Sequence, residues 1–578
     1  MIEYTGRRER QQRRAARAAR WDAGLGWSKL AVFFGGLGLA WLALRSHALR
    51  SWWLLPALLL LAALFVAHDR VLRLRQRAER IVAYYDRLLA RTREQWAGAG
   101  VPGDAFLPPD HPYAADLDLF GKGSLFELLC QARTSIGQQR LADWLLQAAP
   151  PAEVRRRQVR VAALRGELDL RERIAALGHE LQAQLTPAQL QAWAQAPPRL
   201  GARAQAAVLL AGAAVLAGVI YGMADVHYAA TLAALLAAAL LLNRLSPAAA
   251  AALAPRGANG EGLRLLAGVL ALSGRASASG PGPAAGVAAL RRLALLGDWA
   301  EADDSLMGQV LNFTLLYRLQ VAAALDAWRR RHGAALAAWL DQVAECEALL
   351  SLASLAWERP EDVFPEWVET PGAVLWDGEE VGHPLLPASA CVRNGLRLDP
   401  QTRVLLVSGS NMSGKSTLLR AVGVNTVLAH MGAPVRARSL RLTPTALATR
   451  LRTSDSLLLG RSGFYAEILR LRQVFELAEG SRPLLFLLDE LLEGTNSHDR
   501  EIGARGLILA LLARPTLGLV TTHDLALAAL AAEEPRIRNV HLEDHIQGGD
   551  ISFDYRLRDG VVTTSNALAL MRLVGLKV

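Results

Sequence analysis

The sequence predicts an α/β domain with a phosphate-binding loop at the C-terminus, preceded by an all-α region with two transmembrane helical hairpins. Three observations predict this architecture. A glycine-rich loop lies between an apolar run and a helix-like segment at residues 404–422. Two further apolar runs, 484–488 and 517–522, end in polar residues, as buried parallel strands do at the ligand-binding edge of a sheet. Four uncharged segments before residue 244 resemble short membrane spans.

The composition is unusually apolar for a protein with such a domain. The chain has 578 residues, which predicts several domains, and 52% of them are hydrophobic while only 20% are charged. We therefore expect part of the chain to lie in a membrane. The net charge of +10 favours an anionic partner, either DNA or anionic lipid. Cys130, Cys346 and Cys391 are far apart without metal-ligand spacing, which indicates ordinary thiols in a reducing compartment.

The first expected membrane hairpin follows an arginine-rich segment. Residues 7–20 contain seven arginines, and the segments 30–44 and 51–67 contain no charged residue. Each segment is slightly short against the roughly 20 residues of a membrane helix, but Lys29 and Arg45 can extend toward the headgroups. Because arginines flank the hairpin on both sides, both flanks are expected in the cytoplasm. The alternative is a helical hairpin buried in a soluble core.

A second apolar pair interrupts the helical middle of the chain. Residues 204–224 are free of charge and long enough to span a bilayer, and residues 226–243 follow after Asp225. Arg203 and Arg244 stand at the outer ends, which again indicates cytoplasmic flanks. The four segments predict a multi-pass protein of the cell inner membrane with its α/β domain in the cytoplasm. Between the hairpins, the pattern from 116 to 146 predicts a helical stretch.

The loop between the first strand and the helix fits the P-loop pattern G-x-x-x-x-G-K-[ST]. Backbone N–H groups of such a loop, together with the positive end of the helix dipole, hold phosphate oxygens. Lys415 can reach the β- and γ-phosphates, and the hydroxyl of Ser416 can bind Mg²⁺. The residues expected to bind ATP here are Gly409, Ser410, Asn411, Met412, Ser413, Gly414, Lys415, Ser416 and Thr417.

The two later strands supply the remaining expected groups of the active site. The run 484–488 ends in Asp489 and Glu490, which predicts one carboxylate for the metal ion and a second for the attacking water. The run 517–522 ends at His523, on the edge where α/β sheets bind ligands, and we expect this histidine to contact the γ-phosphate.

These motifs together resemble the ATPase domain of the MutS family. The stretches that carry the resemblance are SGSNMSGKST (408–417), SGFYAE (462–467), DELLEGTNSHD (489–499) and TTHD (521–524). Asn411 and Met412 inside the loop separate MutS proteins from most other P-loop proteins. The resemblance is strong over about the last 200 residues of the chain and weaker over the helical middle. It implies a homodimer that binds and hydrolyses ATP and binds DNA.

The resemblance also implies roles for single residues. The loop matching Ser462 reaches the partner's γ-phosphate across the dimer, so Ser462 is expected to be catalytic. Asn496 and His498 match a dimer-facing loop, and Tyr555 matches an aromatic residue near the adenine. The mismatch-reading Phe-x-Glu motif occurs only at 364–366, on a proline-broken linker. We therefore expect a membrane-anchored variant that lacks the mismatch-recognition domain.

The resemblance and the apolar segments together predict seven segments along the chain. They are a basic cytoplasmic arm (1–29), a transmembrane hairpin (30–68), a linker helix (69–110), a MutS core-like helical region (111–203), a second transmembrane hairpin (204–243), a helical lever region (244–370) and the MutS-type ATPase domain (371–578).

The expected function is a membrane-anchored, dimeric ATPase that binds DNA or senses its structure and is related to mismatch repair. Two alternatives stay open. An ABC-type transport ATPase would share the loop and the membrane helices, although SGFYAE stands where such proteins carry Leu-Ser-Gly-Gly-Gln. A cytosolic mismatch-repair protein would use the apolar pairs as core helices.

Overall fold

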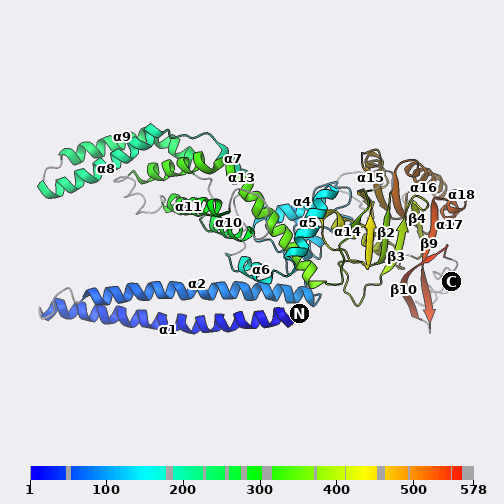
Figure 1. Cartoon of the computed structure of the whole chain (residues 1–578), viewed down its shortest axis with the longest axis horizontal. Helices are drawn as coiled ribbons and strands as arrows, with labels where there is room; N and C mark the ends of the chain where they lie inside the picture. Colours follow the sequence, from blue (N-terminus) through cyan, green and yellow to red (C-terminus); the bar gives the residue numbers. More distant parts are fainter. Residues whose placement is uncertain are drawn as a thin grey trace. The chain divides into compact units, whose positions relative to one another are not determined.

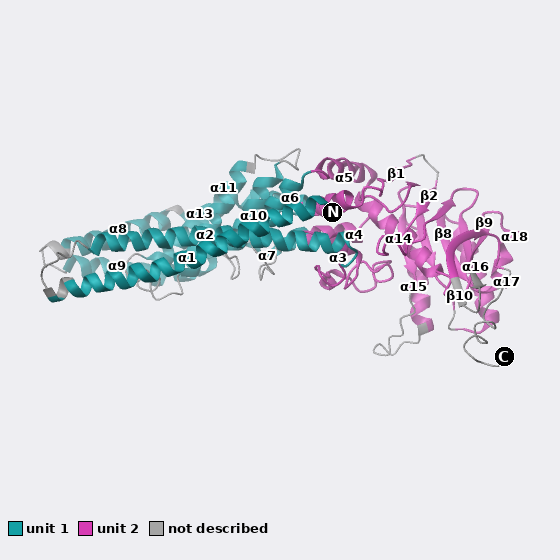
Figure 2. Cartoon of the chain, turned by 90° about the horizontal axis from the view of Figure 1, so that it is seen from below, with its two compact units in different colours: residues 1–95, 133–137, 167–346 teal, residues 96–132, 138–166, 347–578 magenta. Residues whose placement is uncertain are grey.

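The computed structural model describes residues 2–46, 54–177, 187–225, 229–253, 260–274, 283–302, 316–369, 374–410, 412–451, 463–492, 495–547 and 550–562. The chain forms two compact units (Figure 2). Unit 1 consists of residues 1–95, 133–137 and 167–346, and unit 2 of residues 96–132, 138–166 and 347–578. The limits of these units differ from the expected segments, because part of the region 111–203 belongs to the unit that contains the sheets.

Unit 1 is built from helices. The N-terminal pair is α1 (Ile2–Ser46) and α2 (Leu54–Thr92), which lie side by side (Figure 1). The remaining helices are α6 (Leu168–Ala175), α7 (Pro187–Gln195), α8 (Ala202–Asp225), α9 (Ala229–Ala252), α10 (Gly260–Ser273), α11 (Pro283–Ala302) and the first part of α13 (Tyr317–Glu358).

The α1–α2 pair is antiparallel and held by charged side chains. The carboxylate of Asp22 contacts His68 Nε2 and Arg75 Nη1, each at 2.9 Å. Nearer the start of α1 and the end of α2, Arg8 forms an ion pair with Asp86. The expected basic arm and the first apolar segment form one continuous helix, α1. Carboxylates on α2 and α6 neutralise part of its arginine charge.

A second helix pair, α8 and α9, packs through small residues. The Thr231 hydroxyl on α9 donates to the carbonyl of Gly218 on α8 at 2.6 Å. A Cβ at Gly218 would lie 3.1 Å from the Thr231 Cα, so glycine permits this close approach. Next to the pair, the carboxylate of Asp326 on α13 accepts the backbone N–H groups of Arg199 and Leu200, at 2.7 and 2.6 Å.

Four helices among the described residues are long and apolar enough to cross a membrane, judged by length and composition only. They cover Ile2–Leu42, Leu54–Thr92, Arg203–Tyr221 and Ala229–Ala252. The apolar windows of the first two are 0% buried. This finding is compatible with the two expected hairpins.

Unit 2 contains two sheets and their helices. The larger sheet has the order β10-β9-β4-β8-β7-β6, in which all neighbours are parallel except β9 and β10. Its strands are β4 (Val404–Ser408), β6 (Ala446–Arg450), β7 (Leu484–Leu488), β8 (Thr516–Thr522), β9 (Ile537–Gln547) and β10 (Asp550–Asp559). The smaller sheet has the order β1-β5-β2-β3, with β1 (Glu366–Trp367), β2 (Trp376–Val381), β3 (Asn394–Leu398) and β5 (Ser439–Leu442).

The parallel strands form the core of unit 2. Every residue of β4, β7 and β8 is buried, which confirms the strands expected from the three apolar runs. The ring of Phe486 on β7 occupies the place where a side chain on Gly518 of β8 would lie, with a Cβ there only 2.2 Å from the ring. The helices that pack on this sheet are α14 (Lys415–Met431), α15 (Gly463–Ala478), α16 (Ser497–Leu512), α17 (Leu525–Ala528) and α18 (Leu530–Glu533).

An upstream segment of the chain packs on this sheet. The carboxylate of Asp116 accepts hydrogen bonds from Thr449 Oγ1 at 2.7 Å and from Leu451 N at 3.1 Å, at the end of β6. Leu117 packs where a Cβ on Gly423 of α14 would lie. The remaining elements of this part are η2 (Asp104–Phe106), α3 (Leu125–Leu129), α4 (Ser135–Leu146) and α5 (Pro151–Leu164).

The helical stretch expected from 116 to 146 needs correction. Two short helices, α3 and α4, replace it, and residues 116–124 form turns. Gly121 and Gly123 have φ angles of 107° and 76°, which a helix cannot contain. The Ser124 side chain then caps α3 by accepting the N–H of Glu127 at 3.2 Å.

Candidate nucleotide-binding site

The glycine-rich loop lies between β4 and α14, at the carboxyl end of the parallel strands. Gly414 has a φ of 97° and precedes the first residue of α14, so a side chain would be strained there. No side chain caps this helix, and its first N–H groups are therefore available to an anion. The Ser410 hydroxyl is buried without a hydrogen-bond partner among the described residues. Both features suit a loop that closes around phosphate oxygens.

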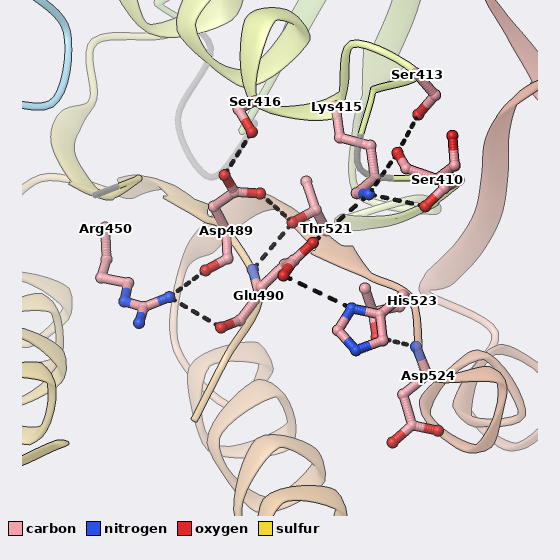
Figure 3. A network of polar contacts seen from close by, with 12 residues as sticks. Ser410, Ser413, Lys415, Ser416, Arg450, Asp489, Glu490, Thr521, His523 and Asp524 are labelled. Carbon is pink, nitrogen blue, oxygen red and sulfur yellow. Dashed lines mark hydrogen bonds and ion pairs between the residues drawn. The ribbon is translucent and has the colours of Figure 1, made fainter. Parts of the chain in front are cut away.

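Lys415 is held inside this loop. Its side chain is 3% exposed, and Nζ donates to the carbonyls of Gly409 at 2.7 Å and Ser410 at 2.9 Å (Figure 3). The same ammonium lies 3.6 Å from Glu490 Oε1. A buried ammonium requires such partners, and phosphate oxygens can replace the carbonyls as stronger ones.

Ser416 and Asp489 meet in front of the loop. The Ser416 hydroxyl donates to Asp489 Oδ2 at 2.6 Å, and the other carboxylate oxygen accepts from the Thr521 hydroxyl (Figure 3). Ser416 comes from the first turn of α14, Asp489 follows β7, and Thr521 lies on the adjacent strand β8. The structure thus brings together the two residues expected to bind Mg²⁺.

These oxygens fit a magnesium ion. Mg²⁺ prefers oxygen ligands and is usually held by one or two protein groups, with phosphates and water completing the shell. A hydroxyl and a carboxylate oxygen within 2.6 Å of each other meet that need. Groups of three or more acidic, histidine or cysteine side chains, which would hold a metal ion without a nucleotide, do not occur among the described residues.

Glu490 and His523 are adjacent at the open side of the site. His523 Nδ1 lies 3.6 Å from Glu490 Oε2, and the histidine side chain is 50% exposed (Figure 3). A cavity of about 20 Å³ borders both residues and Thr522. This volume is enough for about one water molecule. The geometry brings the expected water-activating carboxylate and the expected phosphate contact together.

Three residues that the sequence reasoning missed complete the network. Besides Thr521, these are Arg450 at the end of β6 and Glu467 on α15. Arg450 donates to the backbone carbonyls of Asp489 and Glu490, and its guanidinium forms an ion pair with Glu467 at 3.0 Å. A charged residue at the end of a parallel strand is a signal that could have identified Arg450, because all such ends share one edge of the sheet.

The remaining expected site residues lie on or beside the glycine-rich loop, except Ser462. Tyr555 lies against the loop, since a Cβ on Gly414 would be 3.0 Å from the tyrosine ring. Met412 is 66% exposed and Ser413 is fully buried. Thr417 is the third residue of α14. Asn411 and Ser462 lie outside the described residues.

Asn496 begins a helix, while its expected place in a dimer-facing loop stays a prediction. Its side-chain oxygen accepts the N–H of Asp499 at 2.9 Å and caps α16, whose second residue is His498. The cap fixes the start of the helix.

Comparison with known protein families identifies this part of the chain. The family model of MutS domain V matches residues 405–577, which include the glycine-rich loop, both carboxylates and His523. MutS domain V is an α/β ATPase domain, and MutS proteins work as dimers that bind ATP and DNA. The match confirms the resemblance and the α/β domain at the C-terminus. Residues 405–577 of the chain are thus a MutS-type ATPase domain at its C-terminal end.

Proposed function

We propose that this chain is a membrane-anchored, dimeric MutS-type ATPase whose Mg²⁺-dependent ATP hydrolysis responds to DNA. One observation supports the ATPase part of the proposal. At the carboxyl edge of the parallel sheet, the side chain of Ser416 contacts Asp489 and that of Lys415 lies near Glu490, all beside the glycine-rich loop. The arrangement is the one that phosphoryl transfer from ATP to water requires.

Each residue of the site has one proposed task. Lys415 exchanges its loop carbonyls for the β- and γ-phosphate oxygens, and the N–H groups at the start of α14 bind the same phosphates. Ser416 and Asp489 hold Mg²⁺, which when bound neutralises charge on the phosphates. Glu490 orients the attacking water and accepts its proton, and His523 stabilises the charge on the γ-phosphate.

The loop pattern and the match to MutS domain V support a second copy of this chain as the partner. We propose that Ser462 contacts the γ-phosphate bound to the partner subunit, as the resemblance implies. Tyr555, which lies against Gly414, packs near the adenine. Hydrolysis would then require two ATPase domains to pair.

The apolar helices support membrane anchoring. Four helices have suitable length and composition, and α1 and α2 continue beyond their apolar parts into arginine-rich segments. By the positive-inside rule these segments face the cytoplasm, together with the ATPase domain. We propose the cell inner membrane as the location. The family supports DNA as the partner of the helical region.

A transport ATPase is the second candidate, because it too would combine this site with membrane helices. The sequence SGFYAE argues against it, as does the match to MutS domain V. Vectorial uptake into liposomes, coupled to ATP hydrolysis, would favour the transporter over the proposed function.

The ATPase proposal is tested on the full-length chain in lipid nanodiscs. Lys415→Ala should reduce turnover by about 10²–10³-fold, because it removes a charge that acts on the phosphates in the transition state. Glu490→Gln should retain ATP binding and lose turnover. The control is Arg472→Gln, an exposed residue of α15 whose ion pair is with Glu476 in the same helix. Normal turnover by Lys415→Ala would contradict the proposal.

The DNA part has a separate test. Turnover is measured with homoduplex, mismatched, branched and single-stranded DNA over a salt series. The logarithm of the apparent DNA-binding constant, taken from the DNA concentration at half-maximal stimulation, should fall linearly with the logarithm of salt concentration, because phosphate contacts release counterions. If no DNA stimulates turnover, the partner of the helical region is not DNA.

A further inference from the structure

The turn that carries Glu490 has an unfavourable backbone. Glu490 and Leu492 have φ angles of 46° and 59°, in the left-handed region where side chains other than glycine are disfavoured. Such residues persist when the surrounding structure determines their conformation, and they concentrate at functional sites. The contacts that hold this turn therefore decide where the Glu490 carboxylate points.

Two peptide groups flank the Glu490 Cα, and both are held from outside the turn. Arg450 donates to the carbonyl of Asp489 on one side and to the carbonyl of Glu490, at 2.9 Å, on the other (Figure 3). The N–H of Glu490 itself donates to Thr521 Oγ1 at 3.0 Å. These three contacts fix both peptide planes, and with them the φ and ψ angles of the residue.

Glu467 completes the arrangement from α15. Its Oε1 accepts the N–H of Leu492 at 2.8 Å and lies 3.0 Å from Arg450 Nη2. Both side chains of the pair are only 5% exposed. The pair therefore holds the turn at its start and at its end while each partner neutralises the other's buried charge.

Neither member of the pair needs to touch the nucleotide. Lys415 Nζ and His523 Nδ1 each lie 3.6 Å from an oxygen of the Glu490 carboxylate, whereas Arg450 donates to the backbone carbonyl of that residue. The pair also brackets the segment 452–462 in sequence, because Arg450 precedes it and Glu467 follows it. The expected partner-facing residue, Ser462, belongs to that segment.

We propose that Arg450 and Glu467 are positioning residues that set the orientation of Glu490 for hydrolysis. This inference rests on the proposed ATPase function. It assigns the pair to the chemical step and not to ATP binding, which depends on the loop at 409–416. Loss of the pair should therefore lower kcat and leave the Kd for ATP unchanged.

The first test separates the two quantities. Arg450→Lys keeps the charge but cannot span two carbonyls and a carboxylate. Glu467→Gln keeps an acceptor for Leu492 N–H but removes the charge. Each variant should lower kcat by roughly 10–100-fold, with the Kd of a fluorescent ATP analogue within about twofold of wild type, which is the signature of an interaction lost in the transition state. The control is Arg472→Lys, on the same helix as Glu467, because Arg472 is exposed and its ion pair is with Glu476 of that helix.

A second test excludes a merely structural role. In the double variant Arg450→Met and Glu467→Met, the buried charges are replaced by apolar groups of similar length, a change that often preserves stability. A folded double variant with normal ATP binding and low kcat supports positioning. Normal kcat in that folded variant would overturn the inference, since the turn would then need no pair.

A third test checks that the pair acts through Glu490. In the Glu490→Gln background, Arg450→Lys should cause no further loss of the residual turnover, measured with excess enzyme in a single-turnover assay, because residues that act as a unit are not additive. A full additional loss would overturn the inference. Failure of the ATPase proposal is distinguishable, because there Lys415→Ala and Glu490→Gln would themselves retain activity.

Discussion

The two units use apolar residues in opposite ways. In unit 2, Leu484–Leu488 of β7 are five consecutive apolar residues, and all are 0% exposed. In unit 1, Leu58, Leu59 and Leu60 of α2 are 62, 66 and 52% exposed. The same kind of leucine run thus fills a core in one unit and faces outward in the other. Because an exposed apolar surface of this extent is costly in water, the comparison supports the proposal that this part of α2 lies in a membrane, whereas β7 belongs to a core surrounded by water.

The strongest way to sharpen this comparison is to remove one aromatic ring from each unit. Phe486→Ala should lower the free energy of opening of the sheet by about 3–5 kcal/mol, because it leaves a cavity beside Gly518. Phe65→Ala, at a residue of α2 that is 57% exposed, should leave the sheet unchanged. Hydrogen–deuterium exchange of peptides from β4 and β8 in the full chain measures both effects.

Exchange is preferable to a single melting curve, because a chain with two units does not unfold in one step. If Phe486→Ala left exchange in β4 and β8 unchanged, the buried face of β7 would not be the core of unit 2. If Phe65→Ala raised exchange there as much as Phe486→Ala, the contrast between the two units would be wrong.

The second prediction tests directly whether α2 crosses a membrane. Leu59→Arg should disfavour membrane insertion by about 2.5–3.5 kcal/mol, the cost of arginine at the centre of a membrane helix. Leu74→Arg is the matched control, because Leu74 lies on the same helix and is 61% exposed, but arginines surround it in the sequence. The fraction of full-length chain that stays in the membrane after carbonate extraction measures both. Equal retention of the Leu59 and Leu74 variants would contradict a membrane span at residues 54–67.

Much of the ATPase domain could be predicted from the sequence, because its signals are local. A buried parallel strand is an unbroken apolar run, and the loop after it has fixed glycine and lysine positions. Two strand limits agree closely: 484–488 is β7, and 517–522 is β8 without its first residue, while β4 begins at the start of the expected strand–loop–helix stretch 404–422. Lys415, Asp489, Glu490 and His523 then follow from their places at strand and helix ends.

The contacts that hold the turn could not be predicted in this way, because they depend on register between strands. Arg450 is opposite Leu488 only because β6 pairs with β7 in parallel. Asp116 reaches Thr449 across 333 positions of sequence, and no local pattern encodes that contact. The helix expected over 116–146 is wrong for a related reason. Gly121 and Gly123 interrupt it, and Asp116 hydrogen-bonds to Thr449 at the end of β6 from a turn.

The third prediction uses a buried histidine to distinguish the units by pH. His430 of α14 stacks on Trp367, and burial lowers its pKa to about 4. In the unfolded chain its pKa is about 6.5. The unfolded state therefore binds the proton first as the pH falls, so stability is full above pH 6.5 and decreases down to about pH 4. Between pH 7 and pH 5 this one residue should cost unit 2 about 2 kcal/mol.

The measurement is the urea concentration at which half of the ATP-analogue binding is lost, at pH 7 and at pH 5. His430→Phe keeps an aromatic ring against Trp367 and should reduce the difference between the two midpoints. His332→Phe is the control, because burial also lowers the pKa of His332 but this residue belongs to unit 1. An unchanged difference in His430→Phe would show that His430 stays neutral in both states over this range. A reduced difference in the His332 variant would show that the two units unfold together, and the comparison between them would then no longer hold at acidic pH.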